Sequence, residues 1–143
     1  MISIKRILVP TDFSEYSMQA ITYASELARR FAAELHLLHV AVPLAMPMPY
    51  MGTVSDEVFD PEKSATKALT ELEHPAFETL SPVQRIVRTG TPFVEIVRHA
   101  KENDVDLIVM GTHGRTGLVH ALIGSVAERV VRHAATNVYV VRQ

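Results

Sequence analysis

Five short runs of branched apolar residues alternate along this chain with segments of helical periodicity. The runs span 6–10, 34–40, 83–88, 106–110 and 137–141. They are too brief for helices and are rich in the residue types that favour strands. Because strand and helix signals alternate, the chain is predicted to form a mostly parallel sheet joined by right-handed crossovers.

The segments between the runs begin with helix-start signals, in which a capping residue precedes a proline or an acidic residue. The signals are Ser14, Asp60-Pro61, Thr91-Pro92 and the capping box Ser125–Glu128, with Ser125 at the cap. A chain of 143 residues fits one domain. The predicted fold is therefore α/β, a single doubly wound, Rossmann-like domain over 1–143. Its five-stranded sheet has helices on both faces and strand order 3-2-1-4-5.

Composition excludes several classes of function. The net charge is −2 and basic residues are spread along the chain, so no nucleic-acid surface is predicted. The chain has no cysteine, which rules out disulfides, thiolate zinc sites and cysteine nucleophiles. The apolar run before Pro10 is too short for a signal peptide, and prolines and histidines interrupt the later apolar region 35–51. We therefore expect a cytoplasmic protein without a membrane partner.

A glycine-rich stretch follows the fourth apolar run, with Gly111 and Gly114 in a loop and Gly124-Ser125 at a helix start. Glycine lets ligand atoms approach the backbone, and the amides at a helix N-terminus bind anions. Arg115 would add a compensating charge. The stretch matches neither a Walker A loop nor the G-x-G-x-x-G fingerprint. The residues alone leave phosphate binding and plain turn-and-cap roles equally open.

The spacing Gly111-x-x-Gly114, nine residues, Gly124-Ser125 resembles the G-2x-G-9x-G-[S/T] signature of the ATP-binding branch of the universal stress protein family. "RILVPTDFS", "LLHV" and "GSVAERVVRHA" resemble other parts of that family, so the likeness runs nearly end to end. The resemblance implies ATP as ligand, with Mg²⁺ or Mn²⁺ held mainly by the phosphates and no protein metal site. It also implies a homodimer through the C-terminal strand, 137–142.

The nucleotide-binding positions implied by the resemblance lie after the first, second and fourth strands and at the last helix. They are Pro10, Thr11, Asp12, Val40, Met110, Gly111, Gly114, Arg115, Gly124, Ser125 and Val126. Local alternatives stay open: Asp12 as part of the Ser14 helix start, and Val40 and Met110 as plain core. His36 and His39 are expected on opposite faces of their strand.

The resemblance implies a small stress-response module whose nucleotide occupancy sets the conformation of 43–59 and 111–124, and thereby partner binding. No catalytic residue is assigned, because Arg115 is the one candidate cation and no base accompanies it. A slow ATP-hydrolysing enzyme and a non-nucleotide-binding interaction protein of the same fold are the alternatives. AMP or a cyclic nucleotide in the same pocket is a further one.

Overall fold

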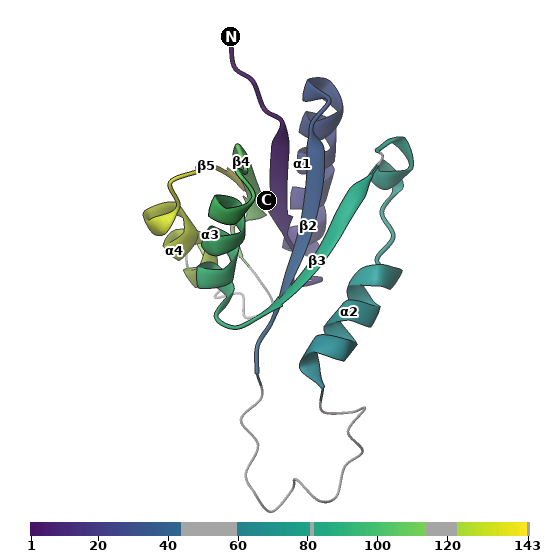
Figure 1. Ribbon diagram of the computed structural model, residues 1–143, viewed down its shortest axis with the longest axis vertical. Helices are drawn as coiled ribbons and strands as arrows, with labels where there is room; N and C mark the ends of the chain where they lie inside the picture. The colour runs from purple at the N-terminus through teal and green to yellow at the C-terminus, as the bar shows by residue number, and fades with distance from the viewer. Residues whose placement is uncertain (44–59, 81, 114–122, 143) are drawn as a thin grey trace, which may run out of the picture.

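Five parallel strands form one sheet in the computed structural model, which describes residues 1–43, 60–80, 82–113 and 123–142. The strands are β1 (Arg6–Pro10), β2 (Glu34–Ala41), β3 (Val83–Thr89), β4 (Leu107–Gly111) and β5 (Asn137–Val141). They pair in the order β3-β2-β1-β4-β5 (Figure 1). The predicted α/β fold and its strand order are confirmed.

Four α-helices and one short 3₁₀-helix accompany these strands within the described ranges. They are α1 (Glu15–Phe31), α2 (Pro61–Glu71), η2 (Pro75–Thr79), α3 (Pro92–Glu102) and α4 (Ser125–His133). No sequence pattern predicted η2. It begins at a proline, and the preceding His74 accepts a hydrogen bond from Ala76 N at 3.2 Å through its Nδ1.

Three of the four predicted helix starts are confirmed. Ser14 caps α1, with its hydroxyl oxygen 3.3 Å from Ser17 N. Asp60 caps α2 and accepts two amide hydrogens of the first turn, both at 3.1 Å. Thr91 precedes α3 without a side-chain cap bond, so the proline that follows it carries the start signal.

The prediction that Ser125 caps the last helix is wrong, because Gly124 is the N-cap and Ser125 is the first helical residue. Gly124 N donates to Thr112 O at the end of β4. A Cβ on Gly124 would lie 2.7 Å from that same oxygen. The close approach of two backbone segments therefore decides where α4 begins.

Helices pack against both faces of the sheet. On β1, Ile7 and Val9 belong to the core cluster that contains buried residues of α1 and α2, whereas Leu8 belongs to the cluster of α3 and α4. All three side chains are 0% exposed. Such alternation is expected of a strand buried on both faces. Within the described residues, no helix combines the length and apolar character needed to cross a bilayer.

Candidate functional site

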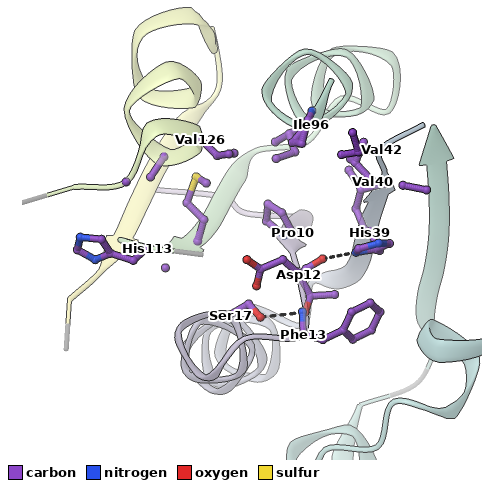
Figure 2. A pocket seen from close by; sticks show the side chains of 18 of the residues that line it. Pro10, Asp12, Phe13, Ser17, His39, Val40, Val42, Ile96, His113 and Val126 are labelled. Atoms are coloured by element: carbon purple, nitrogen blue, oxygen red, sulfur yellow. Dashed lines mark hydrogen bonds between the residues drawn. The ribbon is translucent and has the colours of Figure 1, made fainter. Parts of the chain in front are cut away.

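A cavity of about 630 Å³ opens at the carboxyl ends of β1, β2 and β4 (Figure 2). The strand order reverses beside β1, because β2 and β3 extend to one side of it and β4 and β5 to the other. Ligands of open α/β sheets bind at this reversal point. Residues of α1 and α2 and of the amino-terminal halves of α3 and α4 complete the wall. We call this space the carboxyl-end cavity.

Most of the predicted nucleotide-binding residues lie together in its wall. Those that line the cavity are Pro10, Thr11, Asp12, Val40, Met110, Gly111, Gly124, Ser125 and Val126. Gly114 and Arg115 lie outside the described residues. Residues more than one hundred positions apart in the sequence are therefore brought to one place.

The turn after β1 is held by its own side chains. Thr11 Oγ1 lies 3.0 Å from Ser17 Oγ and accepts the Phe13 amide hydrogen at 3.1 Å. Asp12 Oδ1 accepts from Ser14 N at 3.0 Å, so Asp12 supports the helix start and also lines the cavity. Phe13 has φ 65°, which bulky residues rarely adopt and which concentrates at functional sites.

The two described glycines of the signature are required by packing within the protein. A Cβ on Gly111 would lie 2.8 Å from Tyr16 O in α1, and one on Gly124 would meet Thr112 O. Neither glycine has a positive φ. Both therefore allow the backbone of another element to come close, whereas the sequence-based interpretation had assigned that space to a ligand.

The first turn of α4 presents backbone amides at the cavity. The first hydrogen bond inside this helix runs from Glu128 N to Gly124 O at 3.0 Å. The amides of Ser125, Val126 and Ala127 precede it and have no acceptor within the helix. All three residues line the cavity. A helix N-terminus with free amides attracts anions through these groups and through its dipole.

The opposite part of the wall is apolar. Val40 lies in β2 and Val42 directly follows that strand, and Ile96 of α3 faces them (Figure 2). Val40 and Met110 are 9% and 5% exposed, so both also belong to the core, as the local alternative held. Among the described lining residues, Asp12 is the one carboxylate, and no lysine or arginine is present. The cavity thus combines an apolar wall with amide donors and a single carboxylate.

Several lining residues escaped the sequence-based assignment, among them the four neighbours of predicted positions Phe13, His39, Thr112 and His113. His39 Nδ1 lies 2.7 Å from Thr11 O, and its ring centroid is 4.7 Å from that of Phe13. His113 Nδ1 lies 3.0 Å from Thr112 Oγ1. Each of the four is adjacent in sequence to a predicted residue, which was the available signal.

A metal centre built from side chains does not occur among the described residues. No three histidine, aspartate or glutamate side chains in these ranges gather closely enough to hold an ion. A cation in this cavity would therefore depend on ligand oxygens, as Mg²⁺ commonly does with phosphates.

Comparison with known proteins gives consistent matches over nearly the whole chain. The model of the universal stress protein family matches residues 3–142. Universal stress protein MJ0531 of Methanocaldococcus jannaschii is 37% identical over 142 residues, covering 97% of this chain and 82% of that protein. Universal stress protein UspA from Lactobacillus plantarum has a TM-score of 0.84 at 32% identity, covering 99% of this chain and 100% of its own.

A third match is a universal stress protein solved in complex with cAMP. It has a TM-score of 0.72, and the match covers 98% of this chain and 98% of that protein's chain. Its sequence is 23% identical, so the likeness concerns the fold.

Proposed function

Because the chain belongs to the universal stress protein family, we propose that it binds ATP in the carboxyl-end cavity as a regulatory, stress-response module. The proposal assigns it to the branch with the G-2x-G-9x-G-[S/T] signature. Gly114, which follows His113 in the sequence, completes that signature, and Arg115 is the first of the nine residues that separate Gly114 from Gly124.

The observation that carries this proposal is that the first turn of α4, with its backbone amides, lines the cavity. The amides of Ser125, Val126 and Ala127 lack intrahelical acceptors, and their residues line the space. A phosphate chain supplies the acceptors these amides need. A volume of about 630 Å³ lies within the range of small-molecule and cofactor sites.

The nucleoside would occupy the part of the cavity near β1 and β2. Val40, Val42 and Ile96 offer an apolar surface suited to an aromatic base. The Asp12 carboxylate is a hydrogen-bond acceptor, so it would take an N–H or hydroxyl donor of the base or ribose. The cAMP complex of the fold neighbour is consistent with an adenine nucleotide at this fold.

Charge balance favours a nucleotide bound together with a cation. The described lining residues include no lysine or arginine, whereas ATP carries several negative charges. Mg²⁺ or Mn²⁺ held by the phosphates, with Arg115 beside them, would supply the missing positive charge. We assign no described side chain as a base that activates a water molecule, and we expect hydrolysis to be slow at most.

The proposed assembly is a homodimer in the cytoplasm, formed through the C-terminal strand. β5 stands at the edge of the sheet, and the Tyr139 side chain on it is 45% exposed. An edge strand presents unpaired backbone groups that a second copy can pair. Analytical ultracentrifugation of the purified protein distinguishes a dimer from a monomer.

Occupancy of the cavity would regulate partner binding through 43–59 and 111–124, which flank lining residues of β2, β4 and α4. ATP shifts such an equilibrium only if it binds one conformation better than another. Limited proteolysis with and without Mg-ATP tests this part. Identical cleavage of 43–59 under both conditions would contradict it.

Titration calorimetry with Mg-ATP tests the site itself, using Ser125→Asp and Ser125→Asn. Aspartate in the first turn of a helix favours helix stability, yet it sets a negative charge beside the proposed phosphates. We expect Ser125→Asp to lower ATP affinity by about tenfold or more, and Ser125→Asn to lower it by about threefold at most. Equal affinity of the two variants would contradict the site.

A further inference from the structure

Thr11, the first residue beyond β1, is bonded to β2 through both of its backbone groups. Its N–H donates to Leu38 O at 2.8 Å, and its carbonyl oxygen lies 2.7 Å from His39 Nδ1. The register of β1 and β2 ends at the pair Pro10 and Leu38. In a regular parallel ladder, the next carbonyl would accept from a backbone amide of the neighbouring strand. Here an imidazole donates to it.

The partner of His39 fixes which ring nitrogen carries hydrogen. A carbonyl oxygen only accepts, so Nδ1 must be the protonated nitrogen in the His39 to Thr11 hydrogen bond. In the neutral ring this leaves Nε2 without hydrogen, and in the charged ring both nitrogens carry one. The Nδ1 donor is therefore present in either protonation state.

His39 also contacts the residue on the other side of Asp12. The ring centroids of His39 and Phe13 lie 4.7 Å apart, and Phe13 is the residue held at φ 65°. The flanking residues of Asp12 are thus both in contact with one side chain of the neighbouring strand. Figure 2 shows the hydrogen bond to Thr11, with the Asp12 carboxylate turned into the cavity beside it.

We propose that His39 is a positioning residue for Asp12. By bonding the Thr11 carbonyl and packing on Phe13, it fixes the peptide on each side of Asp12 and so directs the carboxylate at the nucleoside. This role rests on the proposed function, because the position of Asp12 matters for binding only if its carboxylate contacts a bound nucleotide. In this role His39 acts through Asp12 and is assigned no step of any chemistry.

Two substitutions test the hydrogen-bond donor. Both remove the ring that packs on Phe13, but His39→Leu also removes the donor, whereas His39→Asn retains an amide nitrogen near the former Nδ1. We expect His39→Leu to weaken Mg-ATP binding by between about threefold and tenfold in titration calorimetry, and His39→Asn to remain within about twofold of wild type. Equal binding by wild type and His39→Leu would overturn the role of His39 alone.

A double-mutant cycle with Asp12→Asn tests whether His39 acts through Asp12. If it does, His39→Leu lowers affinity by less than about twofold once the carboxylate is gone. The same loss in both backgrounds would overturn the proposal. Wild-type protein that binds no ATP would overturn both this role and the proposed function, so the two failures are distinguishable.

The tautomer gives a readout that needs neither ligand nor variant. When the His39 ring of the wild-type protein is neutral, a long-range ¹H–¹⁵N spectrum should show hydrogen on Nδ1 and none on Nε2. The opposite tautomer would overturn the hydrogen bond from which the inference starts. Amide exchange adds a local check, because Phe13 and Ser14 should exchange faster in His39→Leu, as their acceptors lie in this turn.

Discussion

Polar groups hydrogen-bond to one another at the amino ends of the strands, whereas at the carboxyl ends they surround an open cavity. Asp106, just before β4, accepts from Lys5 N at 2.7 Å and Arg6 N at 3.0 Å through one oxygen. These two backbone hydrogen bonds lower the pKa of the Asp106 carboxyl. At the other end, Asp12 and the first amides of α4 line the cavity.

Two histidines of β2 repeat this contrast and lie on opposite faces of the strand, as predicted. His36 and His99 are 3% and 4% exposed, and His36 Nδ1 lies 3.0 Å from His99 Nε2. His39 instead lines the cavity and bonds Thr11. The comparison teaches that substitutions at the amino end should change stability, and those at the carboxyl end should change nucleotide binding.

Gly111→Ala should break this comparison, because it lies at the carboxyl end and yet affects folding. The new Cβ would stand 2.8 Å from Tyr16 O and 3.0 Å from Tyr16 C, and backbone atoms of a helix cannot move aside cheaply. We expect the free energy of unfolding to fall by about 3 kcal/mol or more, as measured by urea denaturation. Thr91→Ala, which loses no cap bond, is the control, and a variant as stable as that control would contradict the packing account.

Acid should lower the free energy of unfolding through His99, the buried partner of His36. Burial, then the charges of Arg88 and His36, lower the pKa of His99 from 6.5 to about 4. The unfolded chain therefore binds more protons between those values, and stability falls as pH drops from 6.5 to 4. We expect a loss of up to about 3 kcal/mol from this group.

Denaturation at a series of pH values measures this loss, and His99→Gln should reduce the slope in that window. Burial also lowers the pKa of His74, so a smaller dependence of stability on pH should remain in the His99→Gln variant. An unchanged slope in His99→Gln would show that the buried pair does not cause the acid sensitivity.

His36→Leu should sharpen the comparison at the amino end. It leaves the His99 Nε2 without its partner in a buried site, which costs about 2 kcal/mol of unfolding free energy. Replacing both histidines by leucine should recover part of that loss, because neither ring nitrogen of the pair then remains buried without its partner. ATP affinity, measured at a temperature where the variant is folded, should stay within about twofold of wild type.

Ser125→Ala should give the smallest effect, and it should affect binding only. Its hydroxyl is one proposed donor among several, and Ser125 caps no helix. We expect ATP affinity to fall between about twofold and fivefold, with the unfolding free energy unchanged within about 0.5 kcal/mol. Calorimetry and denaturation of the same preparation check both, and a loss of stability without a loss of affinity would reverse the assignment.

Local patterns were enough for much of the fold. Apolar runs marked the strands, and Ser14 and Asp60 marked two helix starts, because caps and branched residues act within a few positions of themselves. The grouping of Asp12 and Ser125 also followed from the predicted parallel sheet, since parallel strands bring their carboxyl ends together, whereas Val40 was assigned through the family resemblance.

Contacts between distant segments were beyond those patterns. Gly124 replaced Ser125 as the cap because Thr112 O lies against it, and no periodicity records that contact. The bond of His39 to Thr11 and the left-handed φ of Phe13 likewise depend on how β2 lies beside the turn. The part of the site that local patterns missed is thus the part that holds its groups in position.

A structure from crystals grown with saturating Mg-ATP tests the central claim most directly. The account predicts phosphates at the amides of Ser125, Val126 and Ala127, with the nucleoside beside Asp12 and the apolar wall of Val40. ATP density at another surface, or an empty carboxyl-end cavity at saturating nucleotide, would contradict it.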